Sequence, residues 1–256
     1  MKPAPFDYVA PATLEEALGL LDEDSRPLAG GQSFVPVLNF RLTRPARLVD
    51  LNRIEGADDC SEQDGTLRIG MLARQARLEG LERWPLLREA VRHVGHPQTR
   101  NRGTVCGSCA HGDPAAELPA ALAALGARFH LRSPRGRRTL GADALFVGYL
   151  TTALEPDELL VEIEVPPHPE GWRFVEHART HGDWADAGAA VAGGRIVLFG
   201  VASTPVAISS LDELDGAVED PWKRAFLRKA LGGVGSTEPP ESEGAEPPGP
   251  RAPERE

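Results

Sequence analysis

The stretch GTVCGSCAHGDPAAELP, residues 103–119, combines a Cys-x-x-Cys pair with glycines, a histidine and the start of an alanine-rich apolar run. A redox dithiol of this spacing lies at the N-terminus of a helix, where the pKa of a thiol falls. Asp113 as N-cap and Pro114 at N1 predict that the helix begins only several residues after Cys109. This offset favours a structural role for the thiols over redox chemistry.

A zinc site in the same stretch would need four ligands at metal spacing. His111 and Cys60 are available besides the pair, but the sequence offers no second pair of closely spaced ligands. The remaining interpretation is a turn-rich loop in which Cys106 and Cys109 are small, partly apolar side chains.

The apolar run after this loop predicts a helix that ends near Gly126, a residue suited to the C′ position. Pro119 lies inside the run and predicts a kink or a restart of the helix, because proline cannot donate a main-chain hydrogen bond.

A second glycine turn, AGGQS at residues 29–33, follows a short predicted strand. Glycine lacks a Cβ and admits positive φ, so main-chain N–H groups in both turns can close around a phosphate. Ser33, Thr104 and Ser108 would add hydroxyl donors. Neither turn is a G-x-G-x-x-G or a Walker A sequence, which excludes the ordinary Rossmann and P-loop interpretations. Two turns that jointly hold a diphosphate, and two simple tight turns, remain as alternatives.

Bulk properties exclude several classes of protein. The 256 residues carry a net charge of -10, with 41% apolar and 26% charged residues. A nucleic-acid-binding protein normally has a basic face, and none dominates in this sequence, so nucleic-acid binding is not predicted. No run approaches the roughly 18 to 20 apolar residues of a membrane span, and the N-terminal residues lack the apolar region of a signal peptide. Three cysteines argue against a disulfide framework and predict a cytoplasmic protein.

The pattern along the chain predicts an α+β protein. A capping box of Thr13 and Glu16 opens a helix, and short strands are predicted in FDYVAP, RPL, ARLVDLN and TLRIGML. A helical segment interrupted by Pro85, a hairpin around residues 134–136 and the alternating strand ELLVEIEVP follow. The chain is then β-rich and closes with a helix in DPWKRAFLRKALGG, before a Pro/Glu-rich tail that predicts disorder.

Four long segments resemble, in order, the FAD-binding medium subunit of the molybdenum hydroxylases. The similarity is to the carbon monoxide dehydrogenase type, related to the flavin domain of xanthine dehydrogenase. The segments are PLAGGQSFVPVLNFRLTRPARLVDLNRI, LRIGMLARQARLE, HVGHPQTRNRGTVCGSCAHGDPAAELPAALAALGA and FVGYLTTALEPDELLVEIEVP.

The resemblance implies a two-part FAD-binding domain of the vanillyl-alcohol oxidase/PCMH type, followed by a small α+β C-terminal domain. The corresponding division is residues 1–52 for the first FAD-binding subdomain and 53–168 for the second. Residues 169–234 would form a shortened C-terminal domain, and 235–256 the disordered tail.

The resemblance also implies the cofactor-binding residues. The first loop would wrap the FAD diphosphate, and the second would contact the phosphate and ribityl side. Glu117 would bind ribityl hydroxyls, Leu160 would pack on the flavin, and Asp183 would lie near the ring. The complete set is Leu28, Ala29, Gly30, Gly31, Gln32, Ser33, Thr104, Val105, Cys106, Gly107, Ser108, Glu117, Leu160 and Asp183.

Cys106 departs from the pattern, because members of this family usually have glycine there. If the position required positive φ, a Cβ would cost on the order of 1 kcal/mol and would crowd the flavin, weakening FAD binding. A flavin-free assembly subunit with a decayed site is therefore an alternative. An oxidase of the berberine and vanillyl-alcohol type is a second alternative, for which the chain looks too short.

The resemblance assigns this chain an electron-transfer role rather than substrate chemistry. A [2Fe–2S] cluster ordinarily needs four thiolates, and the chain has three cysteines. The clusters would lie on a small partner subunit and the molybdenum cofactor on a large one, in a dimer of heterotrimers. FAD would pass electrons from the clusters to an external acceptor, with no catalytic residue or metal on this chain.

Overall fold

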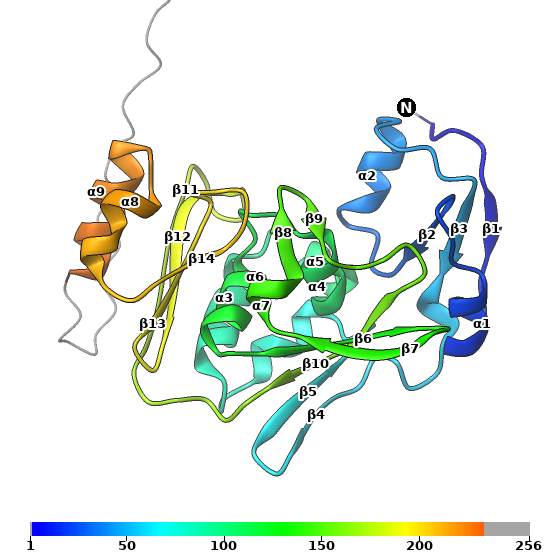
Figure 1. The fold of residues 1–256 in the computed structure, drawn as a ribbon, viewed down its shortest axis with the longest axis horizontal. Coiled ribbons are helices and arrows are strands. Elements are labelled where there is room, and N and C mark those ends of the chain that lie inside the picture. The colour runs from blue at the N-terminus through cyan, green and yellow to red at the C-terminus, as the bar shows by residue number, and fades with distance from the viewer. Residues whose placement is uncertain (1, 233–256) are drawn as a thin grey trace, which may run out of the picture.

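The computed structural model describes residues 2–232 and arranges three sheets in a row along the long axis (Figure 1). The first sheet is parallel, with strand order β1-β3-β2, and helices α1 (Leu14–Gly19) and α2 (Phe34–Asn39) accompany it. Its strands are β1 (Asp7–Val9), β2 (Ser25–Leu28) and β3 (Arg47–Asp50), and the 3-10 helix η1 (Leu51–Arg53) follows.

The central sheet is antiparallel, in the order β4-β5-β10-β6-β7. Its strands are β4 (Cys60–Gln63), β5 (Thr66–Gly70), β6 (Arg128–Ser133), β7 (Gly136–Leu140) and β10 (Leu159–Val165). Helices gather above one face of this sheet (Figure 1). They are η2 (Gln75–Gly80), α3 (Pro85–His93), α4 (Pro97–Arg102), α5 (Val105–His111), α6 (Glu117–Ala124) and α7 (Ala142–Leu145). A small hairpin of β8 (Phe146–Gly148) and β9 (Thr151–Thr152) follows α7.

The third sheet is an antiparallel meander, β11-β12-β13-β14. Its strands are β11 (Trp172–Ala178), β12 (Ala185–Ala192), β13 (Arg195–Phe199) and β14 (Val206–Ile208). Helix α6 packs on β12 and β13, while α9 (Pro221–Leu231) packs on β12 from the far end of the row (Figure 1). The short helices η3 (Leu211–Glu213) and α8 (Leu214–Ala217) connect β14 to α9.

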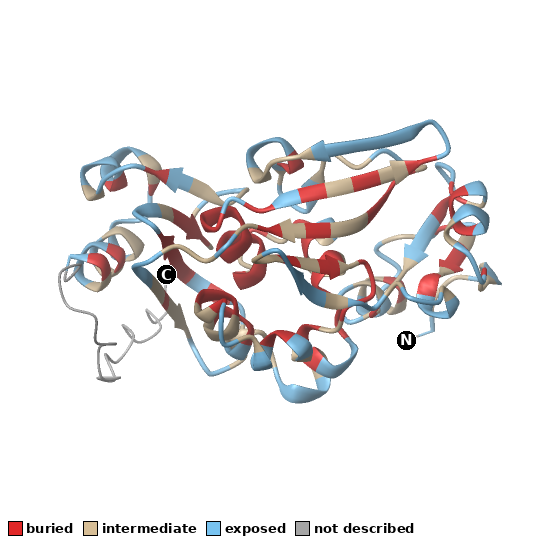
Figure 2. Ribbon diagram, turned by 90° about the horizontal axis from the view of Figure 1, so that it is seen from below, coloured by how far each residue is buried: buried red, intermediate tan, exposed pale blue. Residues whose placement is uncertain are grey.

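Helix α6 is the centre of the core. All eight of its residues are buried, because α3, α5, α7 and the strands β12 and β13 pack around it. Figure 2 shows in red how the buried residues gather in the middle of the molecule. One apolar cluster joins residues of all three sheets, including Val49, Ile163 and Phe199. A smaller cluster lies between the third sheet and α8 and α9. The sheets therefore share most of one core.

Several predictions from the sequence are confirmed by the structure. Thr13 caps α1 and accepts a hydrogen bond from the Glu16 N–H at 3.2 Å, while Glu16 reaches back to the N–H of Ala12. The hairpin of β6 and β7 and the strand β10 lie where the patterns place them. Gly126 follows α6 with φ of +69°, as a C′ glycine should.

Other predictions are wrong at the helix boundaries. The helix expected to begin at Asp113 begins at Glu117; Asp113 instead accepts a hydrogen bond from the N–H of Ala115 in a turn. Pro119 therefore lies in the first turn of α6, where its missing N–H costs nothing, and no kink follows. A separate helix, α5, occupies the cysteine-containing stretch. Helices α2 and α4 were also not predicted.

Within residues 2–232, every helix is too short or too polar to cross a bilayer. The predicted disordered tail, residues 235–256, lies outside the described residues. The division of the chain at residues 52 and 168 remains a prediction.

Gly188 in β12 tests the packing of the third sheet, because its cross-strand partner Phe199 lies over it. A Cβ at this position would lie 2.1 Å from Cζ of Phe199, a fully buried side chain. We expect Gly188→Ala to lower the free energy of unfolding by about 1–3 kcal/mol, because the crowded ring must leave its rotamer. Chemical denaturation measures the change. Gly216→Ala, with no atom within 4 Å of the added methyl group, is the control and should not lower the stability, because alanine favours the helix α8. Equal stability of the two variants would contradict the packing described.

Candidate functional site

The first glycine loop, residues 29–33, joins the end of β2 to the start of α2. Gly31 has φ of +72°, a left-handed conformation that glycine adopts without strain. Within the described part of the chain, the N–H groups of Gly30, Gly31, Gln32 and Ser33 donate no hydrogen bond. Successive unpaired amides in a turn form a concavity that binds anions. The loop thus offers four main-chain donors to a ligand.

The second glycine loop begins at Gly103 and is held by main-chain hydrogen bonds to the segment after β5. Gln75 donates its N–H to the Gly103 carbonyl at 2.9 Å, and Val105 donates to the Ala73 carbonyl at 3.0 Å. Thr104 is the N-cap of α5, and its hydroxyl oxygen accepts the N–H of Gly107 at 3.1 Å. These bonds fix the loop to the central sheet.

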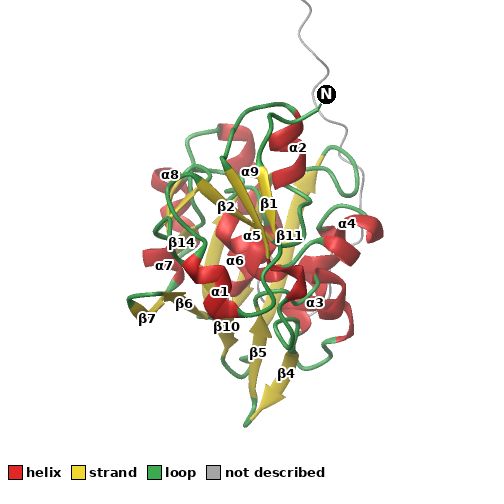
Figure 3. Ribbon diagram, turned by 90° about the vertical axis from the view of Figure 1, so that its right-hand side faces the viewer, coloured by secondary structure: helices red, strands yellow, loops and turns green. Residues whose placement is uncertain are grey.

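The two loops lie in direct contact. A Cβ on Gly30 would lie 2.3 Å from the carbonyl oxygen of Arg102 and 2.8 Å from the Cα of Gly103. A Cβ on Gly103 would lie 2.5 Å from Oε1 of Gln75. Glycine is required at position 30 by this close approach of main chains, and is favoured at position 103 by the buried side chain of Gln75. The view in Figure 3 has the first sheet in front of α5 and α6.

Cys106 does not occupy a strained position. It lies inside α5, outside the set of described residues with positive φ, and is 2% exposed. Its thiol faces the carbonyl oxygens of Ile69 and Gly70, at 3.8 and 3.7 Å. The predicted strain is therefore wrong. The predicted crowding of the flavin remains a prediction, and the direction of the side chain, into the core, argues against it.

The Cys-x-x-Cys pair is unsuited to redox chemistry. Cys109 is fully buried on the same helix, and burial raises the pKa of both thiols well above the ordinary value. Reactive thiols have a depressed pKa and some exposure. The interpretation of the cysteines as packed apolar side chains is confirmed. The predicted offset of the pair from a helix start is wrong, because Cys106 lies in the first turn of α5.

Glu117 begins α6 and is 7% exposed, with Glu176 and His93 as charged neighbours. Burial, reinforced by Glu176, raises the pKa of Glu117 to about 8. His93 lies 3.6 Å from Glu176; burial lowers the pKa of His93, but the hydrogen bond and charge of Glu176 outweigh burial and raise it. Glu117 was expected at the fourth helical position and occupies the first turn, where the helix dipole favours an acid.

The last two predicted residues lie on separate elements. Leu160 is buried in β10, beside a bulge between Leu160 and Glu162. Asp183 lies in the turn between β11 and β12 and accepts a hydrogen bond from the N–H of Trp184 at 2.9 Å. A Cβ on the neighbouring Gly182 would lie 2.7 Å from the Gly95 carbonyl, so this turn packs on the segment that leads into α4.

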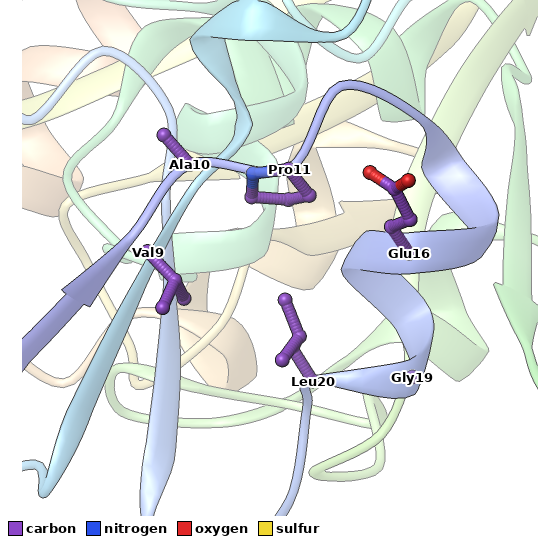
Figure 4. A pocket seen from close by; sticks show the side chains of 6 residues that line it. All are labelled: Val9, Ala10, Pro11, Glu16, Gly19 and Leu20. Atoms are coloured by element: carbon purple, nitrogen blue, oxygen red, sulfur yellow. The ribbon is translucent and has the colours of Figure 1, made fainter.

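A surface hollow lies elsewhere, between the end of β1 and α1 (Figure 4). It contains none of the predicted site residues, and we do not assign the site to it. Its lining residues are Val9, Ala10, Pro11, Glu16, Gly19 and Leu20.

Two polar residues that were not predicted also contact the loops. The side chain of Asn52 donates to the Ala29 carbonyl at 2.8 Å, and that of Arg74 donates to the Arg102 carbonyl at 2.5 Å. Asn52 is the last residue of the predicted strand ARLVDLN, and Arg74 lies shortly after the predicted strand TLRIGML. Polar residues at or shortly after the ends of strands were the available signal, but the sequence does not show that they meet.

The chain is similar in sequence to a known protein family and to individual proteins of established name. Residues 4–168 match the family described as the FAD binding domain in molybdopterin dehydrogenase. The chain is 46% identical over 199 residues to the 6-hydroxypseudooxynicotine dehydrogenase complex subunit alpha of Paenarthrobacter nicotinovorans, covering 74% of this chain and 67% of that one.

Two further similarities involve carbon monoxide dehydrogenase of Hydrogenophaga pseudoflava. Its medium chain is 38% identical to this chain over 244 residues, covering 90% of this chain and 85% of the relative. A solved structure of that enzyme, which lacks the Mo-pyranopterin moiety, superposes with a TM-score of 0.79 at 37% identity, covering 94% of this chain and 90% of that one.

Replacement of Cys106 tests the placement of its side chain. We expect Cys106→Gly to lower the free energy of unfolding by about 1–2 kcal/mol, because glycine is a poor helix former and a buried side chain is lost. FAD affinity should not change, since the thiol faces Ile69 and Gly70. Cys106→Ala, which keeps the helix propensity, is the control. Tighter FAD binding by the glycine variant would show that the sulfur does crowd the cofactor.

Glu117 makes stability depend on pH. Its folded-state pKa of about 8 lies above the ordinary 4.5, so folding favours the protonated form. The protonated carboxyl of Glu117 makes its full contribution to the free energy of unfolding below about pH 4.5, and this contribution is lost as the pH rises through about 8. Glutamine cannot ionise, so Glu117→Gln should gain at least about 1 kcal/mol relative to wild type between about pH 5 and pH 9. Denaturant titrations at both pH values measure this difference, and parallel pH profiles would refute it.

Proposed function

The chain belongs to the family of FAD-binding domains of molybdopterin dehydrogenases, and from this premise we propose that its two glycine loops together hold the diphosphate of one FAD. The membership confirms the resemblance read from the sequence, together with the predicted fold class. The chain is an FAD-binding oxidoreductase subunit of the molybdenum hydroxylase family. The alternatives of a flavin-free scaffold and of a self-contained oxidase are not favoured.

The unpaired amides of the first loop carry the proposal. Four N–H groups of residues 30–33 lack an acceptor within the described chain, and main-chain dipoles of this kind bind phosphate without a lysine. The missing side chain at Gly30 leaves room for the loops to meet. These features fit a diphosphate, and they explain how a chain of net charge -10 can hold an anionic cofactor.

The remaining predicted residues would hold the flavin half. Thr104 and Ser108 would offer hydroxyls on the phosphate and ribityl side, and Leu160 would give an apolar contact. Glu117, with a pKa of about 8, is mostly protonated at pH 7, so it could donate a hydrogen bond to a ribityl oxygen as well as accept one. Asp183 would approach the ring from the turn before β12.

Bound FAD would supply the redox chemistry, because flavin exchanges electrons singly or in pairs. The chain's own residues bind and orient it. Three cysteines, two of them buried and all free, do not suffice for a cluster held by four thiolates. We therefore assign the [2Fe–2S] clusters to a small subunit and the molybdenum cofactor to a large subunit, in a cytoplasmic dimer of heterotrimers.

The substrate of the complex is set elsewhere. Relatives named for 6-hydroxypseudooxynicotine and for carbon monoxide are similarly related to this chain, at 46% and 38% identity. We propose that the large subunit selects the substrate, while this subunit transfers electrons through its bound FAD to the external acceptor.

Reconstitution with FAD tests the proposal. Full-length protein stripped of cofactor should bind about one FAD per chain, with flavin absorption that persists after gel filtration. Gly30→Ala should weaken binding at least about tenfold, because a Cβ 2.3 Å from the Arg102 carbonyl forces the loops apart. Gly19→Ala, with no atom within 4 Å of the new methyl group, should bind as wild type does. A colourless wild-type protein would favour the flavin-free scaffold instead.

A further inference from the structure

Asn52 connects the first glycine loop to the end of β3. Its side-chain amide donates to the Ala29 carbonyl at 2.8 Å and to Oδ1 of Asp50 at 2.6 Å. Asp50 also accepts the main-chain N–H of Asn52 at 3.0 Å and the hydroxyl of Tyr8. The amide of Asn52 is thus held in one orientation, with its oxygen left to accept a bond from another element.

Arg74 makes that bond and reaches the second loop at the same time. Its guanidinium donates to Oδ1 of Asn52 at 2.7 Å and to the Arg102 carbonyl at 2.5 Å. Its main chain forms a β-bridge with Thr104. The Arg102 carbonyl is the atom that lies against Gly30, so one guanidinium group spans the contact between the two loops.

The charge of Arg74 is only partly balanced within the chain. Burial and the nearby positive charge of Arg102 lower its pKa, while Asp58 and Asp50 oppose that change. The two acceptors that Arg74 uses, an amide oxygen and a carbonyl oxygen, are neutral. A diphosphate held by the adjacent loops would bring compensating negative charge to this pair of arginines.

We propose that Asn52 and Arg74 act as one unit, a positioning pair that sets the spacing of the two glycine loops and thereby the affinity for FAD. This inference rests on the proposed function of the loops. Neither residue is a catalytic group; each acts through the main-chain atoms of Ala29 and Arg102. A planar guanidinium with two donors is needed, because a lysine ammonium cannot copy the fork geometry.

The test compares full-length Asn52→Ala, Arg74→Met and the double variant with wild type. The readouts are the dissociation constant for FAD, from quenching of flavin fluorescence, and the unfolding midpoint without FAD. Arg77→Met, which removes an exposed arginine from η2, is the charge-matched control. Each single variant should weaken FAD binding about tenfold, the scale expected for one lost hydrogen bond.

Non-additivity identifies the pair as a unit. The double variant should bind FAD about as weakly as either single variant, since removal of one partner already releases the loops. Arg74→Lys should also bind about tenfold more weakly, although it keeps the charge. If Arg74→Met does not fold, Arg74→Lys carries the same comparison, alone and combined with Asn52→Ala.

The opposite outcomes would overturn the inference. One is that each single variant has a dissociation constant for FAD within twofold of wild type. A second is that the two losses of affinity multiply to about a hundredfold in the double variant. A third is that the Arg74→Lys protein binds FAD as tightly as wild type does. Affinity losses that merely follow lower unfolding midpoints would also overturn it. Failure of the wild-type protein to bind FAD would refute the proposed function itself, which separates the two conclusions.

Discussion

The approach of Gly30 to the Arg102 carbonyl is the constraint on which the candidate site depends. At 2.3 Å from a would-be Cβ, this contact excludes every side chain and brings two loops from different sheets together. The loops reach it from different directions, one after the parallel strand β2 and the other from the segment before α5. In the function proposed above, their meeting lets both glycine turns act as one anion-binding surface for the diphosphate.

Burial, more than charge, shapes the surroundings of that surface. Helix α6 is enclosed on all sides, so the carboxyl of Glu117 at its start loses solvation and holds its proton to about pH 8. Burial likewise raises the pKa of Cys106 and Cys109, which lie on the neighbouring helix α5. Both shifts follow from desolvation of the charged form.

Sequence patterns predicted the elements with strong local signals. The capping box at Thr13, the hairpin of β6 and β7 and the alternating strand β10 each follow from spacing that tertiary contacts do not override. The start of α6 was misplaced because Asp113 and Pro114 are equally good turn residues, and only the packing of α6 decides between the two. The strain expected at Cys106 depended on a φ value, which sequence alone does not give.

The glycines of the candidate site could be predicted from the sequence, but the polar residues that hold the two loops together could not. Gly30 and Gly103 stand out because glycine is the residue that permits close approach. Asn52 and Arg74 are ordinary polar residues after strands, and the contact between them depends on how β3 and β5 lie in two different sheets. No local pattern carries that information.

The placement of the two loops on different sheets has a thermodynamic consequence. The first loop follows a strand of the three-stranded parallel sheet, and the second is bonded to the segment after β5 of the five-stranded sheet. A molecule bound to both loops would therefore link the two parts of the chain that form these sheets. The free energy of binding then stabilises the contact between these two parts, and this stabilisation grows with the logarithm of the ligand concentration. Cofactor supply in the cell would in that way set the fraction of unassembled subunits that is folded at equilibrium.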